Sequence, residues 1–235
     1  VQLGVVPRKV RVAGNSKYDL KPSIASRDEA LVLRAGFFKD NSPVLTLGSL
    51  RPGEEKFWIP VLKERWLPER RFNIIFAPRH KEKFEFFVEQ LQAAGLPFVR
   101  RSETVDGESS ADKVGGGIVL LDTLGELEKV YSFSDISFIG GTLIDWGGHN
   151  PLEAAAYGSA IVLGPGNSRI RDIVEMMRRN HAVLEISSLE DVRKLVEGLA
   201  AGGVDFRSLG EGARRTFDEA SGATLRIVDG IGGVL

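Results

Sequence analysis

The sequence predicts an α/β fold, namely a Rossmann-like parallel sheet with helices on both faces. Two observations support this fold class. Short apolar runs, partly β-branched, alternate with amphipathic segments along most of the 235 residues. The connections between them are short, and repeated strand–helix units with short connections favour a parallel sheet that is covered on both sides. In such folds, ligands bind outside the carboxyl ends of the strands.

Seven short apolar runs are predicted as strands, because each is followed by glycine, proline or a polar residue. They are Val44–Leu47, Phe72–Phe76, Phe98–Arg100, Ile118–Leu121, Ile136–Ile139, Ala160–Leu163 and Ala182–Glu185.

Helices are predicted where apolar residues recur at helical spacing after these runs. They cover Pro52–Trp66, Lys81–Ala94, Thr123–Ser132, Asn150–Tyr157, Ser168–Asn180, Leu189–Leu199 and Phe206–Val228. We expect Pro60 to kink the first of these helices and Gly222 to weaken the last. The polar stretch Ser102–Gly117 is predicted as a loop, and residues 1–34, which lack a clear period, as a linker.

Composition excludes several classes of function. The chain is 43% hydrophobic and 27% charged, as in ordinary soluble globular proteins, and its net charge of -1 gives no support to nucleic-acid binding. Without cysteine it has neither disulfides nor thiolate metal sites, and its three histidines lack the spacing of a zinc site. No apolar run reaches membrane-spanning length. We therefore expect no metal, no nucleic-acid partner and no transmembrane segment.

The most informative loop is Gly140–Glu153, which follows a predicted strand and leads into a helix. Its glycines allow positive φ or the close approach of a ligand, and it does not match the GxGxxG fingerprint. Asn150 stands as the helix cap, Pro151 at the first helical position and Glu153 at the third. The free N–H groups and the dipole at a helix start suit a phosphate. The capping arrangement favours Glu153 as a capping-box partner of Asn150 over a ligand of sugar hydroxyls.

Other polar residues also follow predicted strands, and the carboxyl ends of parallel strands meet at one edge of the sheet. Arg79 and His80 follow the second strand, where Arg79 is equally well explained as a phosphate ligand or as a solvated cation. Ser49 lies in a turn that either binds an anion or only connects strand to helix. Thr123 and Glu126 are placed as a capping box. His149 lies on a loop rather than an apolar face, which favours ligand contact.

Five segments, in order and spacing, resemble motifs of the bacterial 3-deoxy-D-manno-octulosonic acid (Kdo) transferases, which are GT-B glycosyltransferases. The loop from Gly140 to Ala155 closely resembles the family's nucleotide-sugar signature. The other segments are Val12–Asp19, Ala77–His80, Leu121–Leu127, and Leu163–Pro165 with Arg171–Ile173. The chain departs from the family pattern at Leu121, Thr142, Gly166 and Arg169, where the family has Gly, Ser, His and Asn.

The resemblance implies that this chain is the C-terminal half of a GT-B enzyme. Residues 1–34 would be a hinge or linker from a missing N-terminal domain, and residues 35–235 the nucleotide-sugar (donor) binding domain, terminal helix included. That domain would bind CMP-Kdo without a metal. The missing half would hold the lipid A precursor and the catalytic base, so this fragment would be soluble and inactive alone. The whole enzyme would work in lipopolysaccharide biosynthesis at the cytoplasmic face of the bacterial inner membrane.

The resemblance also implies a set of donor-binding residues, among which Glu153 would hold the ribose hydroxyls. The set is Ser49, Arg79, His80, Thr123, Gly125, Glu126, Gly141, Gly148, His149, Asn150 and Glu153. The catalytic residue itself is not identified in this chain. Two alternatives stay open: the donor domain of a UDP-sugar-using GT-B transferase or epimerase, and a non-catalytic nucleotide-binding relative.

Overall fold

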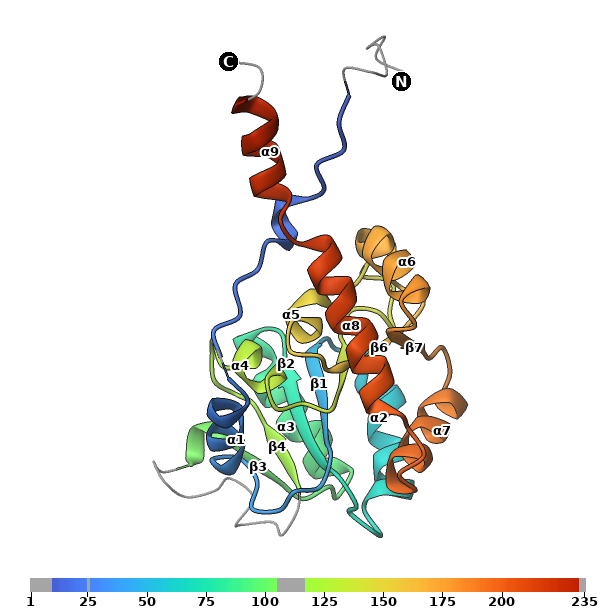
Figure 1. The fold of residues 1–235 in the computed structure, drawn as a ribbon. Coiled ribbons are helices and arrows are strands. Elements are labelled where there is room, and N and C mark those ends of the chain that lie inside the picture. The colour runs from blue at the N-terminus through green and yellow to red at the C-terminus, as the bar shows by residue number, and fades with distance from the viewer. Residues whose placement is uncertain (1–9, 25, 105–116, 233–235) are drawn as a thin grey trace.

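The computed structural model describes residues 10–24, 26–104 and 117–232. A seven-stranded sheet lies at its centre in the order β3-β4-β2-β1-β5-β6-β7, and every strand pair is parallel (Figure 1). The strands are β1 Val44–Leu50, β2 Asn73–Pro78, β3 Phe98–Arg100, β4 Ile118–Leu120, β5 Ile136–Ile139, β6 Ala160–Leu163 and β7 Val183–Glu185. The predicted parallel sheet is confirmed, and each predicted strand is present. Most of the loop predicted over Ser102–Gly117 lies outside the described residues.

Alternation along the strands builds hydrophobic cores on both faces of the sheet. Ile74 and Phe76 of β2 belong to a core on one face, whereas Ile75 and Ala77 belong to a core on the other. Because successive side chains point to opposite faces, a strand that is covered on both sides is apolar at nearly every position. The prediction of short continuous apolar runs succeeded for this reason.

Helices cover both faces of the sheet, as predicted. On one face lie α2 Glu55–Val61, α3 Phe84–Ala93 and α7 Leu189–Ala200. On the other lie α1 Arg27–Ala35, α4 Leu127–Tyr131, α5 Leu152–Ala155, α6 Arg171–Arg179 and α8 Phe206–Ala220. Pro60 lies inside α2, and the helix continues as a π-helical turn over Leu62–Trp66. A proline removes one backbone donor from the helix, and the hydrogen bonding changes to the π-helical pattern just after it; the kink itself stays a prediction.

Helix α1 was not predicted from the sequence. The Ser26 side chain accepts a hydrogen bond from Glu29 N (3.2 Å) and caps the helix, while Ala30 packs into the core. The division predicted at residue 34 therefore falls inside a helix. A short polar helix with a single fully buried residue carries too weak a period to be recognised.

The predicted single helix at the C-terminal end is in fact two helices. Helix α8 ends at Ala220 and α9 covers Ala223–Gly232, with Gly222 between them at φ +82°. The carboxylate of Asp19 accepts hydrogen bonds from the first N–H groups of α9, including Ala223 N (3.0 Å) and Thr224 N (2.6 Å). The break is thus fixed by a residue more than 200 positions earlier, which no local pattern reveals.

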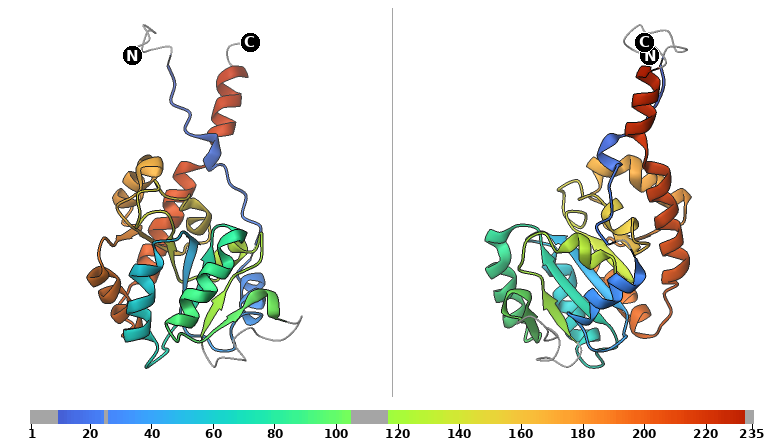
Figure 2. Two further views of the ribbon diagram at one scale, coloured as in Figure 1. Left: turned by 180° about the vertical axis from the view of Figure 1, so that it is seen from behind. Right: turned by 60° about the vertical axis from the view of Figure 1, so that its left-hand side comes forward.

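The N-terminal segment and α9 extend together from the body of the domain (Figure 2). Arg226 Nε donates to the Ala13 carbonyl (2.8 Å), and the Tyr18 hydroxyl donates to the Asp172 carboxylate (3.0 Å). Leu225 of α9 is 70% exposed. The segment that resembles the family's hinge motif is therefore bonded to both α6 and the last helix.

Replacing Phe138 by alanine should lower the free energy of unfolding by about 3–5 kcal/mol, because the side chain is fully buried against Trp58 with ring centroids 5.1 Å apart. Urea denaturation measures the change. The exposed Leu225→Ala variant is the control and should stay within about 0.5 kcal/mol of the parent. A loss below about 1 kcal/mol for Phe138→Ala would contradict this packing.

Candidate functional site

The strand order reverses between β1 and β5, and the candidate site lies at the carboxyl ends of these two strands. The chain moves from β1 to β2 on one side and later returns to β5 on the other, which makes this edge a topological switch point. Gly140 N donates to the Gly48 carbonyl (2.7 Å). A Cβ at Gly140 would lie 2.1 Å from the Ser49 carbonyl oxygen, so this glycine permits contact between the strand ends rather than ligand approach.

A buried carboxylate joins the two strand ends. Glu54 Oε1 accepts hydrogen bonds from Thr142 N and Leu143 N (both 3.1 Å), and Oε2 accepts one from Arg51 N (2.9 Å). The Glu54 side chain is fully buried, and this burial raises its pKa against the opposing effect of the N–H groups. Sequence reasoning missed Glu54, although an acidic residue just after a glycine turn was the available signal. It occupies N–H groups of the Gly-rich loop at Thr142 and Leu143, whereas the N–H groups that the sequence analysis assigned to an anion are those at the start of α5.

The predicted cap at the start of α5 forms only in part. Asn150 Oδ1 accepts a hydrogen bond from Leu152 N (3.1 Å), as a capping residue does. Among the described residues, the Glu153 carboxylate forms no return bond to the Asn150 backbone, so the capping box is absent. Burial raises the pKa of Glu153, the charge of Arg79 opposes this, and Glu128 adds to it. Glu153 is thus a partly buried carboxylate beside a cation, without the competing role in the cap.

Arg51 gathers the side chains of several loops, and the sequence analysis did not identify it. Its Nε lies 3.3 Å from Nε2 of His149, and its Nη2 lies 3.2 Å from Nε2 of His80. The guanidinium carbon of Arg51 is 3.3 Å from the ring centroid of Trp146. Burial of the ring lowers the pKa of His149 to about 4, and the positive charges of Arg79 and Arg51 contribute to this shift. The structure therefore brings both predicted histidines into one cationic cluster, in which His149 is neutral.

The remaining residues of the Gly-rich loop lie in the same place. Gly148 adopts φ +84°, and a Cβ there would lie 2.8 Å from the Ile170 side chain, so both conformation and packing require glycine. Gly141 lies beside Trp146, and Ser49 is buried at the end of β1 with φ +55°. These residues shape the loop around the cationic cluster.

The residues predicted after β4 make contacts of their own. Strand β4 pairs with β2, which leads to Arg79 and His80, and the Glu126 carboxylate bonds to Arg101 (3.0 Å) and to the Thr123 hydroxyl. The expected capping box is wrong, because Glu126 binds these side chains and α4 begins only at Leu127. Gly125 takes φ +81° in the turn between them. Contact of Thr123, Gly125 and Glu126 with a donor stays a prediction.

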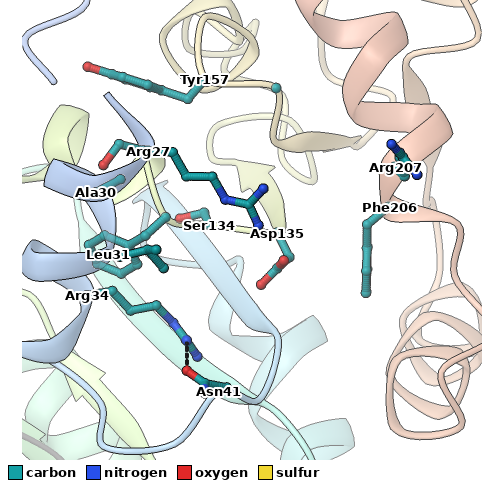
Figure 3. Close-up of a pocket in the computed structure, with 13 residues that line it drawn as sticks. Arg27, Ala30, Leu31, Arg34, Asn41, Ser134, Asp135, Tyr157, Phe206 and Arg207 are labelled. Atoms are coloured by element: carbon teal, nitrogen blue, oxygen red, sulfur yellow. Dashed lines mark hydrogen bonds between the residues drawn. The ribbon is translucent and has the colours of Figure 1, made fainter. Parts of the chain in front are cut away.

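A separate pocket of about 570 Å³ lies at the opposite end of the sheet, between α1, the start of β5 and the start of α8 (Figure 3). It is lined by Arg27, Arg34 and Arg207 around the carboxylate of Asp135, which already accepts a hydrogen bond from Val44 N (2.8 Å). None of the residues predicted from the sequence lines it. The carboxyl edge is the better candidate, because ligands of parallel α/β sheets bind there.

The fold and this edge define a class. A doubly wound parallel sheet with a switch point, a Gly-rich loop and a cationic cluster beside a carboxylate is a Rossmann-like domain of the kind found twice in a GT-B glycosyltransferase. Comparison with known proteins then narrows the class.

No family model matches the sequence. The chain is 28% identical to 3-deoxy-D-manno-octulosonic acid transferase of Haemophilus influenzae, over 97% of this chain and 52% of that protein. It is 31% identical to the protein of the same name from Bordetella pertussis, over 80% of this chain and 44% of that protein. The chain spans about half the length of these curated relatives.

A solved structure agrees. The C-terminal CMP-Kdo binding domain of WaaA from Acinetobacter baumannii matches with a TM-score of 0.70 and 27% identity, over 81% of this chain and 96% of that one. The resemblance drawn from the motifs is confirmed: the chain is a relative of the Kdo transferases and has the fold of the C-terminal half of a GT-B transferase.

The residues that the structure describes contain no group of three or more His, Cys, Asp or Glu side chains placed to hold a metal ion. None of the helices in that part of the chain is long and apolar enough to cross a membrane.

Replacing Glu54 by glutamine should destabilise the fold by about 1–3 kcal/mol, because an amide NH₂ would replace an oxygen that now accepts a backbone N–H. Urea denaturation measures the loss, and amide exchange at Thr142 and Leu143 should accelerate. The exposed Glu175→Gln variant is the matched control. Unchanged stability of Glu54→Gln would contradict the proposed role of this carboxylate.

The stability of the protein should fall as the pH drops from about 6.5 to about 4, in part through His149. The unfolded chain protonates this histidine near its ordinary pKa of about 6.5, whereas the folded protein does so only near a pKa of about 4, so protons favour unfolding in between. His149→Gln should flatten the pH dependence of unfolding over this interval. A ring that titrates near pH 6.5 by NMR would refute the buried cationic surroundings.

Proposed function

We propose that this chain is the donor-binding half of a Kdo transferase and binds CMP-Kdo at the carboxyl edge between β1 and β5. The cationic cluster carries the proposal. The pKa of His149 is lowered by burial and by the charges of Arg79, Arg51, His80 and Arg169. Among the described residues, none of these three arginines forms an ion pair with a carboxylate. A group of cations without ion pairs at a sheet's switch point suits an anionic nucleotide-sugar.

The nucleotide is oriented by the Glu153 carboxylate, which lies near Arg79. Glu153 lies close enough to Arg79 for the cation to act on its pKa, and its carboxylate has no hydrogen bond among the described residues. A carboxylate can accept two hydrogen bonds from the adjacent hydroxyls of a ribose. We place the ribose at Glu153 and the phosphate of CMP at Arg79 and Arg51, near the start of α5.

In the proposed reaction, a hydroxyl of a lipid A precursor attacks the anomeric carbon of Kdo as the bond from that carbon to the CMP phosphate breaks. The acceptor loses its proton to a general base, and CMP leaves with the bonding electron pair. The arginines stabilise the charge that develops on the leaving phosphate, so the step uses no metal.

The rest of the enzyme belongs to the same proposal. The acceptor site and the general base lie in a preceding N-terminal half, the segment before α1 leads from it, and α1 and the residues after it form the donor domain. The whole enzyme would act in lipopolysaccharide synthesis at the cytoplasmic face of the inner membrane. This chain alone would bind donor without transferring sugar.

CMP should bind this chain with a micromolar to millimolar Kd, and Glu153→Gln should weaken binding about tenfold because a charge-assisted bond is lost. Calorimetry gives the affinities, and NMR should show shifts of the amides from Gly147 to Glu153. The variant should weaken the binding of 2′-deoxy-CMP much less, because this nucleotide already lacks one of the two ribose hydroxyls that are proposed to bind Glu153. Glu175→Gln is the control.

The measured nucleotide affinities distinguish the candidate functions. Tighter binding of UDP than of CMP would favour a UDP-sugar-using relative. Binding of neither nucleotide, with no shift of the Gly147–Glu153 amides, would overturn the proposed function and favour a non-catalytic relative. Equal weakening of CMP and 2′-deoxy-CMP by Glu153→Gln would refute the ribose contact alone.

A further inference from the structure

Arg169 lies in the loop after β6 and is fixed against the Gly-rich loop. Its backbone N–H donates to the Gly147 carbonyl (3.0 Å). A Cβ at Gly147 would lie 2.6 Å from Cγ of Arg169, so the arginine stem packs directly over that glycine. The Arg169 guanidinium carbon is 5.0 Å from the Trp146 ring centroid. An exposed arginine with a packed stem and an aromatic support presents its charge from a defined position.

Trp146 supports two cations rather than one. The guanidinium carbon of Arg51 lies 3.3 Å from the same ring centroid, so Arg51 and Arg169 are near neighbours. Arg51 comes from the loop after β1 and Arg169 from the loop after β6, on the two sides of β5. The ring therefore connects cations that arise from both sides of the Gly-rich loop.

Within the part of the chain that the structure describes, neither Arg51 nor Arg169 forms an ion pair with a carboxylate. Glu54 acts on Arg51, but its oxygens already accept backbone N–H groups from Arg51, Thr142 and Leu143. Two neighbouring guanidinium groups repel each other unless an anion lies between or beside them. A ligand anion would supply that compensation.

The cations follow the strand order along this edge of the sheet. Arg79 follows β2, Arg51 follows β1 and Arg169 lies in the loop after β6, so they come in the order Arg79, Arg51 and Arg169. Burial lowers the pKa of Arg51, and both Arg79 and Arg169 are close enough for their charges to lower it further. With a ribose at Glu153 and a phosphate at Arg79 and Arg51, the next cation is Arg169.

We propose that Arg169, held on Trp146 beside Arg51, binds a second anionic group of the donor, the carboxylate of its sugar. This inference rests on the proposed function and adds a residue that determines donor specificity. CMP carries the phosphate alone, whereas CMP-Kdo carries phosphate and carboxylate, so Arg169 contributes mainly to binding of the complete donor.

The test compares CMP with CMP-Kdo on the full chain by calorimetry. Arg169→Gln should weaken the binding of CMP-Kdo about tenfold, which is the effect of losing one charge-assisted hydrogen-bond pair. It should weaken the binding of CMP less than about twofold. Arg169→Lys should recover only part of the loss, because an ammonium lacks the planar fork. Arg179→Gln, which removes an exposed charge at the end of α6, is the matched control and should change neither affinity.

The results distinguish a failure of the Arg169 assignment from a failure of the proposed donor-binding function. Equal weakening of CMP and CMP-Kdo by Arg169→Gln would mean a general field effect and overturn the carboxylate assignment. Unchanged affinity for both would overturn it as well. Failure of the parent chain to bind either ligand would instead overturn the proposed function on which the inference rests. Retained CMP affinity in Arg169→Gln shows that the variant is folded.

Discussion

The buried carboxylate of Glu54 is the interaction on which the site depends. It binds the backbone N–H groups of Thr142 and Leu143 and so fixes the Gly-rich loop to the turn after β1. A buried ionised group is costly unless it is fully hydrogen-bonded, and here three N–H groups meet it. Because these groups are occupied, a ligand anion must be bound chiefly by side chains and by the start of α5.

The side chains available are cations, and their arrangement follows from the loop that Glu54 holds. Arg51 donates its backbone N–H to this carboxylate and extends its guanidinium over Trp146 and beside both histidines. The Glu153 carboxylate, whose pKa is raised by burial, lies close enough to Arg79 for the cation to oppose this rise. A group of cations beside a carboxylate matches the charges and hydroxyls of a nucleotide-sugar, which connects the geometry of the loop to the proposed donor.

The sequence was sufficient for the sheet, since strands that are covered on both faces are apolar throughout. It located Arg79, His80, His149, Asn150 and Glu153 because each follows a strand or begins a helix. Arg51 and Glu54 escaped notice, since their roles depend on contacts with residues about 90 positions away. The break before α9 depends likewise on Asp19. Local patterns report periodicity and capping, whereas these residues act through tertiary contacts.

A crystal structure of this chain with bound CMP would show directly whether the donor binds at the carboxyl edge between β1 and β5. We expect the phosphate to lie against Arg79 and Arg51 and the ribose hydroxyls to lie within hydrogen-bond distance of the Glu153 carboxylate. The contacts of Glu54 with Thr142 and Leu143 should remain intact. CMP bound elsewhere, as in the arginine-lined pocket at the other end of the sheet, or a ribose turned away from Glu153, would contradict this arrangement.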